Sequence, residues 1–135
     1  MTQTLPLLDR PVPAGFPAPV DERSSGRIDL NAHLIQQADA TFLVRVEGDS
    51  MTGFGIHDGD TLVVDRSVEA QDGHIVLAVI GDEFTLKQLR RDGQRFILRA
   101  GNPRYQDRIV KFGEDFSVWG VARWSLHPLI GTPRN

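Results

Sequence analysis

Cysteine is absent from the 135 residues of this sequence, and so are long apolar runs. Without cysteine the chain has neither a disulfide scaffold nor a metal site built on thiolates, although its compartment stays open on this ground alone. No stretch approaches the roughly 18 apolar residues of a membrane-spanning helix, and the N-terminus, MTQTLPLLDRPVP, lacks the basic and apolar regions of a secretory signal. We therefore expect a soluble, cytoplasmic protein without a membrane partner.

Lysine is nearly absent as well, because thirteen of the fifteen basic residues are arginine and the only lysines are Lys87 and Lys111. The net charge of -3 argues against broad binding of nucleic acid. A local phosphate-contacting patch and a solvated hairpin face are the alternatives for one group of arginines: Arg90, Arg91, Arg95 and Arg99. Lys87 needs its own explanation, because it lies in an apolar, strand-like run, DEFTLKQL.

The chain from residue 41 onward has the pattern of a β protein. Seven runs of five to nine residues are rich in β-branched and aromatic types: TFLVRV, TLVVD, HIVLAVI, EFTLKQL, RFILRA, RIVKF and FSVWGVARW. Short strands at this spacing predict a mainly β fold with a compact curved sheet or a small barrel. The pairs Gly81-Asp82 and Asp92-Gly93 are typical of tight hairpins, because these residue types tolerate positive φ.

The first forty residues have a different composition, with five prolines between residues 6 and 19. Proline lacks a backbone donor and biases the preceding residue toward extended backbone, so residues 1 to about 26 are expected as an arm. In RIDLNAHLIQQADAT, Asn31 is the predicted cap of a short helix, with Leu30 placed to pack against its apolar turn. We accordingly divide the chain into an N-terminal arm and short helix, residues 1–39, and a β domain, residues 40–135.

Ser50 lies in a glycine-rich turn, VEGDSMTGFGIHDGD, directly after the first expected strand. Such a turn can hold a hydroxyl at the sheet surface while neighbouring backbone N–H groups stay free to bind an oxyanion. Serine beside Asp and Gly is also an ordinary turn former or helix cap. From the residues alone, Ser50 is either a turn residue or a nucleophile.

A nucleophilic serine needs a base, because its hydroxyl is a poor nucleophile at its free pKa. None of the four histidines has a spacing that recommends a Ser-His-Asp triad. Lys87 is the better candidate, since burial in an apolar strand would lower its pKa and leave a neutral amine as general base. The alternative is a lysine on the exposed face of an edge strand.

The remaining polar and aromatic signals have simpler explanations. Asp58 and Asp60, in HDGD, are not followed by a glutamate at calcium-loop spacing, so we interpret them as a turn and expect no metal and no other cofactor. Four aromatic residues near the C-terminus are interpreted as core or interface anchors: Phe112, Phe116, Trp119 and Trp124.

Five segments resemble, in order and spacing, the UmuD proteins, which are relatives of the LexA and phage-repressor self-cleaving proteases of peptidase family S24. They are PAGFPAP, RIDLNAHLIQ, ATFLVRVEGDSM, GDTLVVD and GHIVLAVIGDEFTLK, and they cover roughly residues 14 to 121. GDSM followed 37 residues later by FTLK is far more specific than either motif alone. The resemblance implies a LexA-like protease domain with Ser50 as nucleophile, Lys87 as general base and cleavage between Ala14 and Gly15.

The same resemblance implies a role in the SOS response to DNA damage. Cleavage would be slow until a RecA filament on single-stranded DNA assists it, and the shortened homodimer would serve an error-prone translesion polymerase with UmuC as its subunit. FSVWGVARW is the candidate dimer surface. About 35 residues separate Gly15 from Ser50, enough to reach the chain's own site or a dimer partner's. The arm is shorter than is usual for UmuD, and Ala14 stands where UmuD often has cysteine.

Other classes of protein fit the sequence less well. A LexA-like repressor needs a helix-turn-helix, for which residues 1–40 are too short and too rich in proline, so we expect no sequence-specific DNA binding. A signal peptidase shares the Ser-Lys chemistry but needs a membrane anchor. The alternatives that remain are a phage-type regulator of the same fold and a non-catalytic β module that binds protein or single-stranded DNA, although the aromatics are too scattered for a base-stacking platform.

Overall fold

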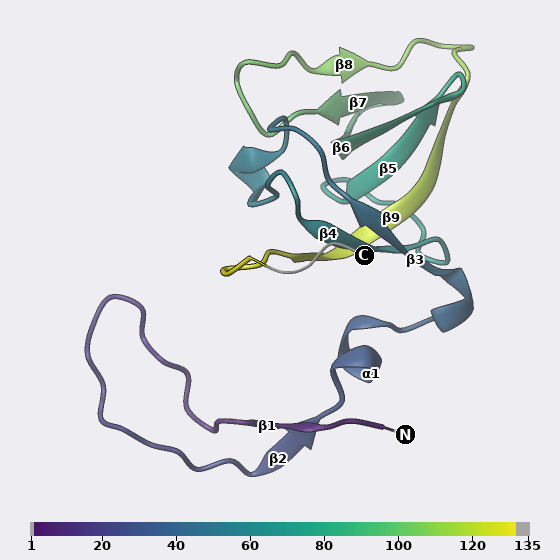
Figure 1. Cartoon of the computed structure of the whole chain (residues 1–135). Helices are drawn as coiled ribbons and strands as arrows, with labels where there is room; N and C mark the ends of the chain where they lie inside the picture. Colours follow the sequence, from purple (N-terminus) through teal and green to yellow (C-terminus); the bar gives the residue numbers. More distant parts are fainter. Residues whose placement is uncertain (1, 132–135) are drawn as a thin grey trace. The chain divides into compact units, whose positions relative to one another are not determined.

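The computed structural model describes residues 2–131, which fall into two compact units, Met1–Gln36 and Gln37–Asn135. One seven-stranded antiparallel sheet is the framework of the second unit, whereas the first contains a two-stranded sheet and one short helix (Figure 1). The mainly β fold with a short helix is therefore confirmed. No helix within residues 2–131 is long and apolar enough to cross a membrane.

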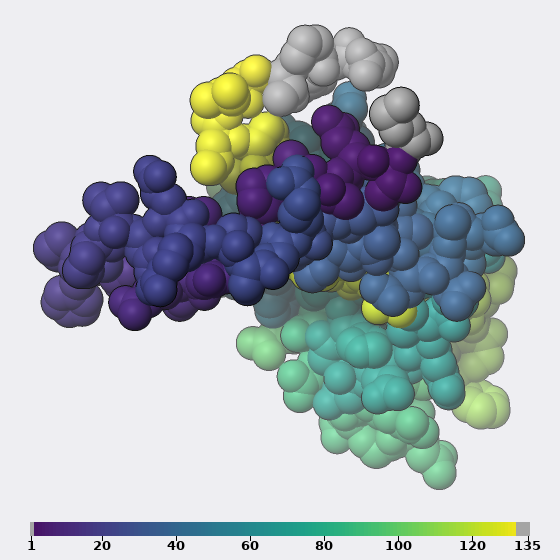
Figure 2. All heavy atoms as spheres, turned by 90° about the horizontal axis from the view of Figure 1, so that it is seen from below, coloured from purple at the N-terminus to yellow at the C-terminus, as the bar shows by residue number. Residues whose placement is uncertain are grey.

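The first unit is a long loop closed at its base by two short strands. Strand β1 (Leu5–Leu7) pairs antiparallel with β2 (Gly26–Ile28), so the proline-rich segment between them leaves and returns at the same place. The unit forms an elongated body in the space-filling view, where it runs from purple to dark blue (Figure 2). None of residues 2–36 is buried, so pairing and polar contacts, and not a core, hold the loop together.

Helix α1 (Leu30–Leu34) follows β2 directly, and its cap corrects the sequence-based prediction. Asp29 is the N-cap, and its Oδ1 accepts hydrogen bonds from the N–H groups of Asn31 at 3.0 Å and Ala32 at 3.4 Å. Asn31, the predicted cap, lies inside the helix instead. Asp and Asn are about equally good caps, so composition alone does not choose between neighbouring positions.

The second unit is built on the seven-stranded sheet. Its strands are β3 (Thr41–Arg45), β4 (Thr61–Asp65), β5 (Ile75–Ile80), β6 (Glu83–Asp92), β7 (Arg95–Arg99), β8 (Arg108–Ile109) and β9 (Phe116–Leu126), with 3-10 turns η1 (Ala38–Ala40) and η2 (Thr52–Phe54). The strand order is β3-β4-β9-β5-β6-β7-β8, and every neighbouring pair is antiparallel. Within the described residues the order runs from one edge strand to the other, which favours the open curved sheet over the closed barrel.

Two tight hairpins connect β5 to β6 and β6 to β7. In the first, Ile80 faces Glu83, and only Gly81 of the two loop residues has a positive φ, 62°. A glycine at the first central position is the pattern of a type II′ turn, whose twist matches that of the strands. In the second hairpin Asp92 is still a strand residue, so the loop begins at Gly93 and lies one residue later than the sequence predicted.

Strand β8 is shorter than predicted, because a turn replaces its second half. Glu114 closes this turn: its carboxylate accepts from the N–H of Lys111 at 3.0 Å, and its own N–H donates to the Lys111 carbonyl at 3.0 Å. Phe112 inside the turn is fully exposed. Of the two roles considered for Phe112, core residue or interface anchor, the first is therefore wrong, whereas Phe116 packs against the core.

The sheet buries apolar side chains on both faces, in two clusters. One cluster gathers Val46, Met51, Ile56, Leu62 and Val64. The other gathers Val76, Ala78, Leu89, Leu98 and Val121. Because successive side chains of a strand point to opposite faces, the second cluster takes alternate residues of β5, while the residues between them turn toward the first.

Candidate active site

Ser50 lies in the loop between β3 and η2, and buried neighbours fix this loop. Met51, the next residue, is 2% exposed and packs into the first apolar cluster. The N–H of Gly48 donates to Asp58 Oδ1 at 2.7 Å, and that of Gly59 donates to the Val46 carbonyl at 2.8 Å. The partly buried Ser50 is therefore held in a braced turn at the end of a strand.

The backbone N–H groups of Ser50 and Met51 are free to bind a ligand. Neither donates a hydrogen bond to another residue in the part of the chain that the structure describes. Two adjacent N–H groups beside a serine Oγ are the donors that an oxyanion of acyl transfer requires. The sequence analysis expected backbone N–H groups of this turn to have this role.

Lys87 lies on β6 opposite Val76 of β5 and is partly buried. Burial lowers the pKa of its amine from the ordinary value of 10.5, because desolvation disfavours the charged form. Its Nζ donates to the carbonyl of Leu86 at 3.0 Å. Because the side chain is partly buried, the alternative of a lysine on an exposed face is wrong, although β7 pairs only with residues 88–92 of β6.

Ser50 and Lys87 line the same pocket, which has a volume of about 530 Å³. Apolar and aromatic side chains form most of its wall: Val44, Leu62, Leu77, Phe84, Leu86 and Trp119. Within residues 2–131 no hydrogen bond joins Ser50 Oγ to Lys87 Nζ; the lysine amine donates to a backbone carbonyl instead. The pocket thus combines a hydroxyl, an amine of lowered pKa and two unpaired N–H groups in a mostly apolar setting.

Trp119 enters the pocket wall because of a β-bulge in β9. Leu77 faces Gly120 and Ala78 faces Val118, so Trp119 is an extra residue that no partner opposes. Bulges turn a side chain in a new direction. Its ring lies 5.1 Å from that of Phe42 and 5.6 Å from that of Phe84. No local pattern predicts this bulge, so the sequence analysis interpreted Trp119 only as a core or interface anchor.

Two histidines, His57 and His127, lie beside Asp60. Asp60 is fully buried and accepts hydrogen bonds from the His57 N–H at 2.8 Å and Ser125 Oγ at 3.1 Å, and it pairs with His127 Nδ1. Burial raises the pKa of Asp60, but these hydrogen bonds and the pairing with His127 outweigh it and lower the pKa overall. The arrangement stabilises the turn that was predicted at HDGD.

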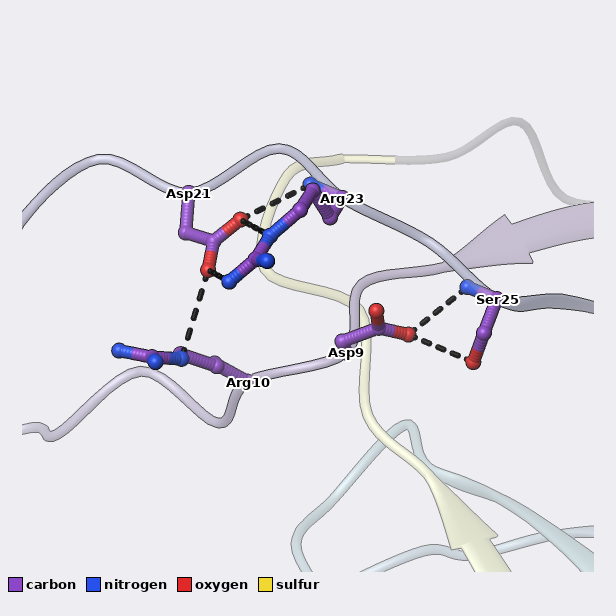
Figure 3. Close-up of polar contacts among 5 residues, drawn as sticks. All are labelled: Asp9, Arg10, Asp21, Arg23 and Ser25. Atoms are coloured by element: carbon purple, nitrogen blue, oxygen red, sulfur yellow. Dashed lines mark hydrogen bonds and ion pairs between the residues drawn. The ribbon is translucent and has the colours of Figure 1, made fainter.

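Ala14 and Gly15, the residues of the expected cleavage site, lie in the first unit. Both are exposed and belong to a bend within the proline-rich loop. At the base of this loop, Asp9 Oδ1 accepts from the N–H and Oγ of Ser25 at 2.7 and 2.8 Å (Figure 3). The carboxylate of Asp21 binds the Arg23 guanidinium at 3.0 and 2.9 Å and Arg10 Nε at 3.4 Å. The peptide bond between Ala14 and Gly15 is thus exposed in a loop whose two ends are joined by hydrogen bonds and ion pairs.

This chain is similar to proteins of a known peptidase family and to several curated proteins. Residues 6–123 match the model of the family described as Peptidase S24-like. Protein SamA of Salmonella typhimurium strain LT2 is 39% identical over 129 residues, covering 96% of this chain and 89% of SamA. Protein ImpA of Salmonella typhimurium is 44% identical over 123 residues, which cover 90% of this chain and 83% of ImpA. The LexA repressor of Cupriavidus necator is 42% identical over 122 residues; this chain spans 55% of its length.

A serine and a partly buried lysine in one pocket of a mainly β domain are typical of the Ser-Lys class of hydrolases. The chain belongs to the Peptidase S24-like family and is a self-cleaving serine protease. Its relatives over most of their length, SamA and ImpA among them, are UmuD-like proteins of SOS mutagenesis, so the resemblance and the function class expected from the sequence are confirmed.

Proposed function

We propose that Ser50 and Lys87 form a catalytic dyad that cuts the peptide bond between Ala14 and Gly15. The observation that supports this assignment is their shared pocket, in which burial lowers the pKa of the lysine. A lysine of lowered pKa is neutral in a larger fraction of molecules at neutral pH, and only the neutral amine accepts a proton.

The reaction follows from the groups around Ser50. Neutral Lys87 accepts the proton of Ser50 Oγ as the oxygen attacks the carbonyl carbon of Ala14. The N–H groups of Ser50 and Met51 stabilise the tetrahedral oxyanion. Its collapse breaks the bond to Gly15, whose amine takes the proton from Lys87. Water, deprotonated by the same lysine, then hydrolyses the ester and frees Ser50.

The proline-rich loop has the properties of an internal substrate. Pro13 and Pro17 bias Val12 and Phe16 toward extended backbone, which suits binding as an added strand. Strand β3 is an edge of the sheet and leads directly into the Ser50 loop, so its free edge is the natural place for such a strand. Ala14 and Gly15 have side chains small enough for close approach to Oγ.

The partners of this protease follow from its relatives. A RecA filament on single-stranded DNA assists cleavage in the cytoplasm, and the shortened homodimer then serves a translesion polymerase with a UmuC-type subunit. The dimer surface proposed for FSVWGVARW is narrower than the whole segment. Strand β9 is paired with β4 and β5, so the large apolar side chain of this segment that is available for contact is Trp124, which is 41% exposed; Leu126, equally exposed, lies two residues beyond the segment.

The test uses the protein with a RecA filament and follows the loss of full-length chain. Ser50→Ala and Lys87→Ala abolish cleavage, whereas the matched control Lys111→Ala, on the exposed turn, cuts at the parental rate. Because the chain has no cysteine, Lys87→Cys can be aminoethylated selectively to restore an amine at this position. Restored cleavage is expected; cleavage by Lys87→Ala at the parental rate would exclude the dyad.

A further inference from the structure

The loop that follows β7 lies against the Ser50 loop, although the two are about fifty residues apart in the sequence. The N–H of Gly101 donates to the Ser50 carbonyl at 2.7 Å, and the N–H of Gly53 donates to the Gly101 carbonyl at 2.5 Å. A Cβ on Gly101 would lie 2.6 Å from Phe54 Cδ2, and one on Gly53 would clash with the Gly101 carbonyl. Only glycine at both positions allows this close approach.

Three side chains of the same loop bind Asp49, the residue before Ser50: Asn102, Tyr105 and Arg104, whose Nη1 lies 3.7 Å from Asp49 Oδ2. Asn102 Nδ2 donates to the Asp49 carbonyl at 3.0 Å, and the hydroxyl of Tyr105 donates to Asp49 Oδ1 at 2.6 Å. The other end of the Asn102 amide is also bound, because its Oδ1 accepts from the N–H of Arg104 at 3.0 Å. The amide therefore has a fixed orientation with its donor toward Asp49.

These contacts determine where the two free N–H groups point. The Asp49 carbonyl and the Ser50 N–H belong to one planar peptide unit, and the Ser50 carbonyl and the Met51 N–H belong to the next. Neither unit is cis, so each N–H points opposite to the carbonyl of its unit. Asn102 makes the shortest hydrogen bond to the first carbonyl, at 3.0 Å beside Thr52 Oγ1 at 3.2 Å and the Thr52 N–H at 3.4 Å, and Gly101 binds the second. The loop thereby aims both unpaired N–H groups away from itself.

We propose that residues 101–105 orient the oxyanion site, with Asn102 and Tyr105 as positioning residues for self-cleavage. The inference rests on the proposed role of Ser50 as nucleophile. Asn102 acts through the peptide unit that carries the Ser50 N–H, and Tyr105 holds the same residue through its carboxylate. Neither side chain takes part in proton transfer, which stays with Lys87.

Two isosteric variants test this role. Asn102→Asp keeps the acceptor toward Arg104 but removes the donor toward Asp49, and Tyr105→Phe removes only the hydroxyl. Loss of a direct oxyanion donor costs about 100- to 1000-fold in rate, so loss of its orientation is expected to slow cleavage about 10- to 100-fold in Asn102→Asp and less in Tyr105→Phe. Arg99→Gln, an exposed change just before the loop, is the matched control and keeps the parental rate.

Three readouts separate positioning from a general loss of structure. The rate is measured from pH 7 to 10 without RecA: the variants lower it at every pH, but the midpoint, which reports Lys87, does not move. The melting temperature stays close to that of the parent. In heteronuclear NMR spectra the amide resonances of Ser50 and Met51 shift, whereas that of Val76 in the opposite cluster does not.

The outcomes distinguish this inference from the proposed dyad. Cleavage at the parental rate by both isosteric variants, in a series where Ser50→Ala and Lys87→Ala are inactive, overturns the positioning role alone. A changed pH midpoint also overturns it, because the loss would then act on Lys87. Activity in Ser50→Ala would instead remove the dyad. If Asn102→Asp does not fold, the rate and amide shifts of Tyr105→Phe decide.

Discussion

At the scale of the residue, the proposed chemistry depends on one partly buried amine. Lys87 Nζ has a backbone carbonyl as its hydrogen-bond partner, and no carboxylate forms an ion pair with it within residues 2–131. Burial is thus the cause that acts on its pKa, and it acts downward. A nearby carboxylate would have favoured the charged form and opposed this effect.

The pH dependence of self-cleavage follows from this amine. Without RecA the rate is expected to increase from pH 7 toward pH 10, because the fraction of neutral Lys87 increases over this range. Since burial lowers the pKa, the midpoint lies below the ordinary value of 10.5. The measurement is the first-order rate of loss of full-length chain across this range. A rate that stays constant would show that Lys87 is not the rate-limiting base.

Asp60 contributes to the stability of the fold and not to the proposed chemistry. Its pKa is lower in the folded than in the unfolded state, so its contribution is fully present above about pH 4 and is lost as the pH falls through the folded value. Asp60→Asn is expected to lower the free energy of unfolding at pH 7 by about 1–3 kcal/mol and to flatten its decline in acid. Urea unfolding from pH 3 to 7 checks this, with exposed Asp82→Asn as control. Equal stability of both variants would contradict it.

At the scale of the element, β9 links the core to the pocket through its bulges. A second bulge lies where β9 pairs with β4: Val63 faces Trp124 and Val64 faces Ala122, so Arg123 has no opposite residue. Arg123 Nε donates to the buried carboxylate of Asp65 at 2.8 Å. Gly120 follows the first bulge, at Trp119, and packs its backbone against β4. The same strand therefore completes the sheet and supplies a wall of the candidate site.

Gly120→Ala tests how tightly this bulge is packed. A Cβ on Gly120 would lie 2.6 Å from Val64 Cγ1 and 3.4 Å from Arg66 Cγ. Such overpacking is expected to lower the free energy of unfolding by about 1–3 kcal/mol and to slow cleavage by moving Trp119. Gly26→Ala, whose Cβ would have nothing within 4 Å, is the control for urea unfolding. If both variants were as stable as the parent, the space beside Gly120 would accept a methyl group, and the tight packing of β9 against β4 would be contradicted.

The strands were predictable because their signal is local. Alternation and turn residues located every strand of the large sheet, and β4 has the predicted bounds, Thr61–Asp65. The bulge at Trp119 depends on pairing with a strand distant in the sequence. The Asp29 cap and the turn that ends β8 are local, with partners two or three residues away, but the sequence pattern did not distinguish them from the predicted cap and the longer strand. Ser50 and Lys87 were candidates from their local sequence, but only their joint motif favoured nucleophile and base over a turn residue and an exposed lysine. Asn102 and Tyr105 were missed because their contacts with Asp49 span more than fifty residues.

At the scale of the whole molecule, the two units differ in what holds them together. Every buried residue among residues 2–131 lies between Val46 and Val121, in the second unit. Cleavage after Ala14 removes β1 and leaves β2 without its partner strand, but it removes no buried side chain. The β domain therefore keeps its core after processing.

The fragment from Gly15 to Asn135 is accordingly expected to fold, dimerise and support damage-induced mutagenesis without proteolysis. Full-length Ser50→Ala, which stays uncut, is expected to fail. Complementation of a strain lacking its own UmuD, with induced mutation scored after DNA damage, compares the two. Equal mutagenesis from both would mean that cleavage is not the switch, and an unfolded fragment would mean that the arm is structural.

The central claim is that this chain cuts itself after Ala14 with its own Ser50. The most direct measurement is the intact mass of purified protein after incubation at pH 10 without RecA, beside Ser50→Ala treated identically. We predict two products from the parent, residues 1–14 and residues 15–135, and an unchanged mass for the variant. A parent that stays intact, or a break elsewhere, or the same break in Ser50→Ala, would contradict the account.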